Sequence, residues 1–418
     1  MSSIKPACKA CFRGGFLAIT LLALSAFADT ADPTLEAILA KAVTDHPSIL
    51  QRLSENEAAR SESEVAKWQR YPTINVSASE ANSDISQANT VIQQPLWTGG
   101  RITAAINEAE AGVKASDHAV NQAEVLILNE TVARFFELER ANRSAEIARA
   151  NVVEHERLFD IIKRRVEAAT SPDVDEMLAL ARLQYAESDA VAFEGAKDSA
   201  RGALSQLVGE PVAAIAAPDI PQPVMMTRDA LLDIALNYAP SMAALGAEKD
   251  RFSAQLEGAK AEARPQLALA YDRRFGDLLP GQEQEQLFLQ VEYTPGAGFS
   301  KRSAIAAARA RERGSMQAIE AERRTLTTQI DILWSELQSA YRQRGPAQRL
   351  ADATAEVVDS YLRQYTVGRK SWLDVLNAQR EATQAKYTLV NAETSLMSAH
   401  YRLQVLLGQI NATSLGVR

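Results

Sequence analysis

The chain has 418 residues and a formal net charge of −8 at pH 7. An acidic chain without a cluster of basic residues is a poor candidate for binding nucleic acid. This length would ordinarily indicate two or three domains, but the order of segments described below predicts one elongated unit made of two similar halves.

Residues 1–28 predict a secretory signal peptide. Basic residues precede the apolar run 16–24, and Ala26-Phe-Ala28 has the small-residue pattern of a cleavage site. The run is too short to span a bilayer as a helix. Because Cys8 and Cys11 both fall in this segment, we expect no cysteine in the mature chain.

Two helices and a hairpin follow. Thr34 predicts the start of the first helix, and His46-Pro47 ends it because the residue before a proline avoids the helical region. A second helix is expected at about 48–69. The apolar period then changes to two over 73–79 and again over 89–97, which predicts two antiparallel strands with one apolar face.

The next segment predicts two unusually long helices. Residues 101–169 contain no proline, and at about 1.5 Å per residue they would form a helix on the order of 100 Å long. Apolar residues recur every seven positions at Ile106, Val113, Val120 and Ile127, as in a coiled-coil seam. A turn at 170–172 leads to a return helix that ends near Gly209. The seam of the return helix is rich in alanine, which permits close helix packing: Leu183, Ala186, Ala190, Phe193, Lys197, Ala200, Leu204 and Leu207.

The second half repeats this order at a nearly constant offset of about 200 residues. The landmarks Pro47, Pro72, Pro95, Asp175 and Gly209 recur as Pro240, Pro265, Pro295, Asp374 and Gly408. We therefore predict one domain over 29–418, made of the repeats 34–211 and 228–410. A proline- and alanine-rich linker at 212–227 would join the two repeats.

The last two helices carry further signals. In the second long helix, at about 301–366, Gly345-Pro346 predicts a kink or a local unwinding. The final helix has two offset apolar seams, which indicates neighbours on both sides, as in a closed ring of helices. Four half-apolar strands can cross a membrane only within a closed barrel, and four are too few to close one. Either the hairpins are soluble, or several copies of the chain share one barrel.

Taken together, these features resemble the TolC family of outer-membrane channel-tunnels. The most specific segment is Tyr365–Gln379, in which Val367-Gly368 and Asp374-Val375 match the family pattern V-G-x(5)-D-V. The resemblance implies a mainly α fold with a small β part: internally duplicated, long antiparallel helices that form a trimeric α-helical tunnel. Four strands per chain would contribute to a shared twelve-stranded outer-membrane β-barrel. A collar of short helices, from residues near the linker, 37–57 and the C-terminal tail, would surround the tunnel.

The resemblance also places a periplasmic gate at the two helical tips, with Asp175, Tyr365, Lys370 and Asp374 at matching positions. A tyrosine hydroxyl and an ammonium can both donate to a carboxylate, and three copies of Asp374 around one axis would attract cations. Asn377 stands where many relatives carry a second acidic ring, so this ring should be less charged. The alternative is that Asp175 and Asp374 only cap the starts of helices.

The same tips are the predicted docking place for a periplasmic adaptor. Val367 and Gly368, with their repeat-mates Ala168 and Ala169, are the candidates, because small residues let helices approach closely. Many relatives have Val-Gly where this chain has Ala168-Ala169. We therefore expect Ser171-Pro172 to interrupt the helix at the first tip.

No catalytic, cofactor or metal site is expected. The histidines His46, His118, His155 and His400 have no acidic or cysteine partners at ligand spacing, and no nucleophile motif of a hydrolase occurs.

The function that the resemblance implies is a passive outer-membrane exit duct of a Gram-negative bacterium, with its helical part in the periplasm. A periplasmic adaptor and an inner-membrane pump of the ABC or RND type would recruit it, and outer-membrane lipid would surround its strands. Residues 368–380 are more similar to members that serve type I protein secretion than to members that serve multidrug or small-molecule efflux, which is the alternative. A soluble periplasmic coiled-coil adaptor or structural protein is the alternative of another class.

Overall fold

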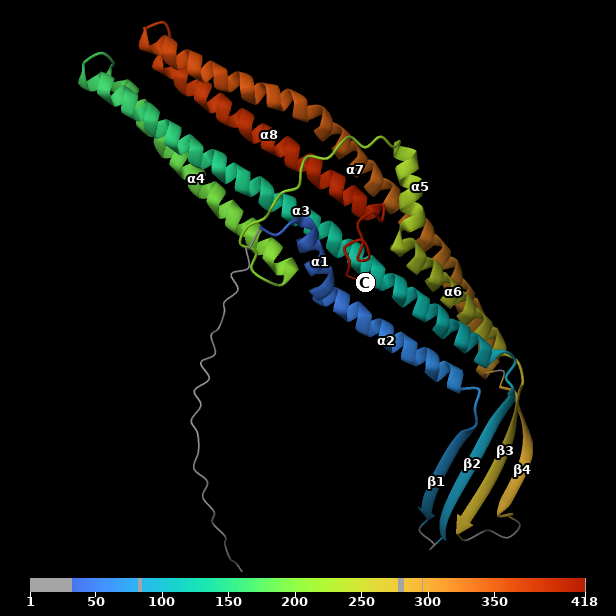
Figure 1. The fold of residues 1–418 in the computed structure, drawn as a ribbon. Helices are drawn as coiled ribbons and strands as arrows, with labels where there is room; N and C mark the ends of the chain where they lie inside the picture. Colours follow the sequence, from blue (N-terminus) through green and yellow to red (C-terminus); the bar gives the residue numbers. More distant parts are fainter. Residues whose placement is uncertain (1–31, 82–84, 277–281, 295, 418) are drawn as a thin grey trace, which may run out of the picture.

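The computed structural model describes residues 32–81, 85–276, 282–294 and 296–417 (Figure 1). The predicted signal peptide and both cysteines lie outside these residues. The first half contains the elements α1 (Leu35–Asp45), α2 (Pro47–Trp68), β1 (Thr73–Ala81), β2 (Ile85–Trp97), α3 (Arg101–Glu167) and α4 (Asp173–Val208). The second contains α5 (Arg228–Tyr238), α6 (Pro240–Ala261), β3 (Gln266–Gly276), β4 (Glu285–Glu292), the short helix η1 (Ala297–Phe299), α7 (Ser300–Thr366) and α8 (Trp372–Leu406). Apart from η1, the two halves have the same order of elements.

The predicted helix boundaries are confirmed, and local chemistry explains them. The Thr34 hydroxyl accepts the Ala37 N–H at the start of α1, and Thr227 caps α5 in the same way. Pro47 and Pro240 each occupy the first turn of the following helix. A proline fits there because its missing N–H would have no helical partner in any case.

Each long helix is paired with two shorter ones that lie end to end. Helix α3 packs against α4 over one part of its length and against α2 over the other, while α7 packs against α8 and α6 (Figure 1). Contacts of α3 with α6 and α8 join the two halves. With 67 residues each, α3 and α7 are about 100 Å long and run the length of the helical part. The sheet lies at one end and the two helical tips at the other.

The strands form one four-stranded antiparallel sheet in the order β1-β2-β3-β4. The predicted hairpins are thus confirmed, and pairing of β2 with β3 joins them. One row of cross-strand partners, Ile74–Ile92–Tyr271–Leu287, runs across all four strands. On the same face, Leu289 and Val291 of β4 are 58% and 68% exposed. The opposite face carries polar residues such as Asp272 and Arg274, which form an ion pair. The sheet is therefore amphipathic, and β1 and β4 are its open edges.

A collar lies against the middle of the long helices, and we define it as α1, α5, residues 212–227 and residues 407–417. Helix α1 shares an apolar cluster with α3 and α8, and α5 shares another with α7 and α8. Several hydrogen bonds fix the linker, among them those from the Val212 N–H to the Ser205 hydroxyl, from the Ala216 N–H to the Pro33 carbonyl and from the Tyr341 hydroxyl to the Pro221 carbonyl. Figure 1 shows the linker crossing the long helices at this level.

Helix α7 stays helical through Pro346. The local unwinding considered for Gly345-Pro346 is therefore wrong, since the chain keeps its helical conformation although proline donates no hydrogen bond there. Among the described helices, none has an apolar stretch long enough to cross a membrane.

Candidate functional site: the two helical tips

The first tip ends α3 by a left-handed turn at Ala169, whose φ is 55°. The Thr170 N–H donates to the Arg165 carbonyl over 2.8 Å, and the Thr170 hydroxyl donates to the same oxygen. This pattern closes the last turn of a helix and ordinarily uses glycine. The expectation that Ser171-Pro172 interrupts the helix was therefore wrong: Ala169 ends it, at the steric cost of a Cβ in that conformation.

The second tip ends α7 in the same way, with glycine at the left-handed position. Gly368 has a φ of 76°, and the Arg369 N–H donates to the Gln364 carbonyl over 2.9 Å. A methyl group built at Gly368 would meet no atom within 4 Å. The glycine is thus required by the backbone conformation and not by a neighbour inside this chain.

Asp374 forms a capping box with Ser371 at the start of α8. The Asp374 carboxylate accepts the Ser371 N–H over 3.0 Å and the Ser371 hydroxyl over 2.8 Å, while the Asp374 N–H donates to that hydroxyl. These two hydrogen bonds from Ser371, with a smaller contribution from Lys370, lower the pKa of Asp374. Helix capping is therefore one role of this carboxylate, and its ionised form is favoured.

The two tips are joined through Tyr365. Its hydroxyl lies 3.1 Å from that of Ser171, and the guanidinium carbon of Arg165 lies 4.7 Å from the centre of its ring. The Trp372 ring, at the start of α8 on the same tip, lies 5.0 Å from the Tyr365 ring. Tyr365 and Trp372 are buried in an apolar cluster that also includes residues of α3 and α4. The ends of both hairpins therefore pack as one unit.

The remaining predicted gate residues make no ion pair among the described residues. The Lys370 ammonium lies 4.2 Å from the centre of the Tyr361 ring, a cation–π contact. Asp175 lies half-buried in the first turn of α4, where the helix dipole favours a negative charge. Asn377 is half-buried on α8. The structure thus brings Tyr365, Lys370 and Asp374 to one tip and Asp175 to the other, without a direct bond between them within one chain.

The predicted docking residues lie on the outside of the tips. Ala168, Ala169, Val367 and Gly368 are all exposed, and Val367 exposes 68% of its surface. The beginning of α4 adds further exposed apolar side chains, Val174 and Met177.

Three tip residues were missed from the sequence: Arg165, Ser171 and Trp372. Trp372 is the first residue of α8. A tryptophan at this position is a signal that the sequence does offer, because large aromatic side chains usually pack against other elements. Arg165 and Ser171 carry no such signal, because their contact with Tyr365 depends on how the two hairpins are placed beside each other.

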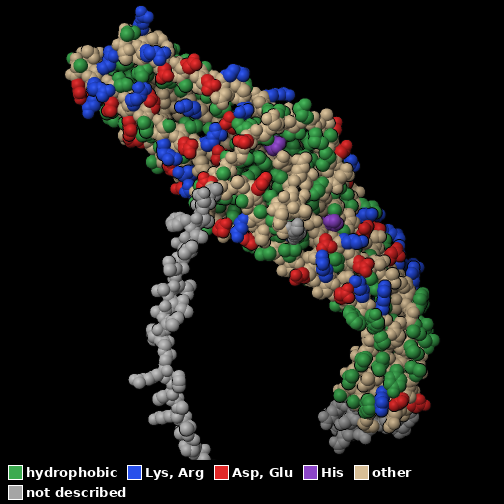
Figure 2. Space-filling view, in the orientation of Figure 1, with side chains coloured by type: hydrophobic (Ala, Val, Ile, Leu, Met, Phe, Trp, Pro, Cys, Tyr) green, Lys and Arg blue, Asp and Glu red, His purple; other side chains and the backbone are tan. Residues whose placement is uncertain are grey.

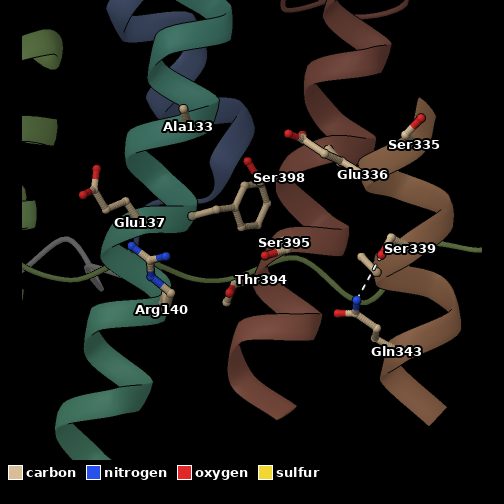
Figure 3. Close-up of a pocket in the computed structure, with 13 residues that line it drawn as sticks. Ala133, Glu137, Arg140, Ser335, Glu336, Ser339, Gln343, Thr394, Ser395 and Ser398 are labelled. Carbon is tan, nitrogen blue, oxygen red and sulfur yellow. Dashed lines mark hydrogen bonds between the residues drawn. The ribbon is translucent and has the colours of Figure 1, made fainter. Parts of the chain in front are cut away.

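Farther along the molecule, a groove of about 690 Å³ lies between α3, α8 and α7 (Figure 3). Ser339, Ser395 and Ser398 supply hydroxyls, and Glu137 and Arg140 supply charges. Figure 3 shows part of the collar passing behind these helices. Figure 2 shows Lys, Arg, Asp and Glu side chains mixed over the helical part and mostly hydrophobic side chains over the sheet.

Metal binding finds no support in the described residues, among which no group of three His, Cys, Asp or Glu side chains is placed to hold an ion. Burial lowers the pKa of His155 and of His400.

Known proteins resemble this chain over most of its length. A family model described as outer membrane efflux protein matches residues 38–210 and 231–409. The outer membrane protein OprJ of Pseudomonas aeruginosa is 24% identical, covering 90% of this chain and 84% of OprJ. The outer membrane efflux protein BepC of Brucella suis is 34% identical over a shorter stretch, 21% of this chain and 20% of BepC. The crystal structure of the outer membrane protein VceC from Vibrio cholerae superposes with a TM-score of 0.79 at 16% identity, covering 90% of this chain and 96% of VceC.

Proposed function

This chain belongs to the outer membrane efflux protein family and has the channel-tunnel fold of TolC-like proteins, and from this premise we propose that it is the exit duct of a tripartite export system. A periplasmic adaptor and an inner-membrane pump would deliver the substrate, and the duct would conduct it passively across the outer membrane.

The observation that carries the proposal is the set of open edges along the whole molecule. At the sheet end, β1 and β4 each have one unpaired side. Along the helices, α2 and α4 border α3 on one side and α7 is the outermost helix on the other. A single chain thus has two matching edges, and copies placed side by side around an axis would close both the sheet and the helical wall.

The proposed assembly is a homotrimer. Four strands cannot close a barrel, whose smallest known form has eight, and open strand edges are excluded from lipid. Three copies would give twelve strands with the apolar face of Ile74, Tyr271 and Leu287 turned toward outer-membrane lipid and the polar face of Asp272 and Arg274 inward. This assignment of faces follows the exposure of the apolar row.

Membrane fractionation followed by unheated gel electrophoresis tests the assembly. We expect the protein in the outer-membrane fraction, extracted only with detergent, and a band of trimer size that collapses to monomer on heating. A soluble periplasmic monomer would contradict the proposal and favour the coiled-coil adaptor or structural protein instead.

We propose the tips as the gate and the docking place of this duct. Tyr365, with Lys370 and Asp374 nearby, lies where hairpins of neighbouring copies would meet, with Asp175 on the other tip. Asn377 would leave the constriction with fewer charges. The exposed small residues Ala168, Ala169 and Gly368, with Val367, would form the groove for an adaptor hairpin. Cysteine pairs between the exposed Val367 and a candidate adaptor hairpin test the docking. Crosslinks confined to the tips are expected, and none at the tips would contradict it.

Two cargo classes are proposed for the same duct. The tip segment 368–380 favours type I protein secretion, whereas the word efflux in the family description and in the name of BepC favours the alternative, multidrug or small-molecule efflux. A deletion strain distinguishes them. Loss of a secreted protein with unchanged drug sensitivity supports the first, and increased drug sensitivity with normal secretion supports the second.

A further inference from the structure

A pocket lies in the wall of the helical part, where the C-terminal end of α8 meets the N-terminal end of α6. Leu406, the last residue of α8, and Pro240, the first residue of α6, both line it, and both helices pack on α3 and α7. Because α8 and α6 do not form one continuous helix, their junction leaves a space between the two long helices. The space has a volume of about 350 Å³, within the usual range for small-molecule pockets.

The interior of this pocket is mostly apolar. Side chains of α7 provide one wall, Leu326, Ile330 and Leu333, and the corner between α5 and α6 closes another with Ala235 and Tyr238. Leu126 of α3 and Ile332 of α7 also line it and are 62% and 52% exposed. Two large aliphatic side chains thus stay in contact with water beside an apolar cavity, and a bound apolar group would cover them.

Arg402 supplies a cation at the same place. Its side chain lines this pocket and also the neighbouring groove that contains Arg52 and Glu130. The Arg402 Nε is buried without a hydrogen-bond partner, and no ion pair to Arg402 occurs among the described residues. By contrast, Arg52 pairs with Glu55 and Glu130 lies 3.8 Å from Arg134. Arg402 is only partly buried, and an anion in the pocket would give the remaining N–H groups of its guanidinium a charge-assisted acceptor.

Glu322 is the acidic group that lines the pocket, and helix geometry places it away from Arg402. It precedes Ile330 by two turns of α7, about 12 Å along the helix axis. Leu403, the residue next to Arg402, packs in one apolar cluster with Ile330 and Leu337 of α7. Leu337 is even farther from Glu322 along α7 than Ile330 is, so Arg402 lies on the side of the pocket away from Glu322. The cationic and acidic groups therefore lie toward opposite ends of the pocket.

We propose that this pocket binds a small amphipathic anion, with its apolar body between α3 and α7 and its anionic group on Arg402. The site is built within one chain and needs no neighbouring copy. Its existence does not depend on the cargo, the pump or the gate.

Two fluorescent probes with the same aromatic body test the charge requirement. The probe 8-anilinonaphthalene-1-sulfonate carries an anion, and N-phenyl-1-naphthylamine is neutral. With the full chain held in amphipol without free detergent, we expect saturable binding of the anionic probe. Arg402→Gln should weaken it about tenfold or more, since a charge-assisted hydrogen bond is lost, and should leave the neutral probe within about twofold.

Matched variants identify the place of binding. Gln329→Trp, at an exposed position that lines the pocket, should weaken both probes by blocking access. Arg140→Gln removes an arginine from the groove of Figure 3 and should change neither. Each variant is first checked for the wild-type oligomer on an unheated gel, and Arg402→Lys, which keeps the charge, should retain part of the affinity. Unchanged binding of the anionic probe in Arg402→Gln and Gln329→Trp, or equal affinity of both probes for the wild type, would overturn the proposal.

Discussion

The Tyr365 hydroxyl lies 3.1 Å from the Ser171 hydroxyl, and this hydrogen bond connects the end of α7 with the turn between α3 and α4. One hairpin end is therefore held to the other inside a single chain, next to the buried Trp372. Any movement that separates the α7–α8 tip from the α3–α4 tip must break this bond and open the apolar cluster beneath it. The cluster, with its larger buried area, makes the greater contribution to holding the tips together.

Removing the tip contacts of Tyr365 and Lys370 should widen the aperture. We expect Tyr365→Phe combined with Lys370→Ser to raise single-channel conductance in planar bilayers, because the hydroxyl bond and the cation–π contact with Tyr361 are both lost. Tyr365→Phe alone should cost about 1 kcal/mol of local stability. Ser171→Ala should have the same effect as Tyr365→Phe, and the pair should not be additive. Unchanged conductance in the double variant would leave capping as the role of this tip.

Each tip has one residue in the left-handed conformation, Ala169 at the first tip and Gly368 at the second, so exchanging alanine and glycine should change the stability of the two tips in opposite directions. Ala169→Gly should stabilise the first tip by about 1 kcal/mol, because it removes a Cβ from a disfavoured conformation, and Gly368→Ala should destabilise the second by a similar amount. Hydrogen exchange of the Thr170 and Arg369 amides, which close the two turns, measures each effect. Faster exchange at Thr170 in Ala169→Gly would contradict the assigned conformation.

The capping box predicts a pH dependence of the second tip. Hydrogen bonds from Ser371 lower the pKa of Asp374 below its ordinary value of 3.8. The stabilisation is therefore complete above that ordinary value and is lost as the pH falls through the lower pKa of the folded state. Exchange of the first-turn amides of α8 should accelerate in that acidic range in the wild type. In Asp374→Asn exchange should be faster already at neutral pH and should lack this acid transition.

Local signals made most of the fold predictable. Pro47 and Pro240 define helix starts through their own backbone, and the alternation at Leu287, Leu289 and Val291 defines a strand. The pairing of β2 with β3 was not predicted. The alternation of apolar and polar residues shows that a segment is a strand, but it does not show which strand of the other hairpin pairs with it. The left-handed Ala169 was missed because alanine seldom adopts this conformation, so the residue type gives no warning.

The candidate site was predictable only in part. The match at 365–379 located the tip, and the capping pattern of Ser371 with Asp374 is visible in the sequence. The partner of Tyr365 is not, since Ser171 is nearly two hundred residues away along the chain. The predicted carboxylate contacts of Tyr365 and Lys370 are absent within the described residues of one chain, and bonds between copies remain a prediction for the trimer.

A buried carboxylate farther from the tips should be a strong determinant of stability. Glu393 of α8 lies 2.7 Å from Arg143 of α3 and 3.4 Å from Arg344 of α7, and only 8% of its side chain is exposed. Because Glu393→Ala leaves two partly buried arginines facing each other, we expect a loss of about 2 kcal/mol or more, measured as a lower dissociation temperature on unheated gels. The control is Glu137→Ala, which removes an ion pair to Arg134 on the surface of one helix and should cost less than about 1 kcal/mol. Equal effects of the two variants would show that Glu393 does not join the halves of the chain.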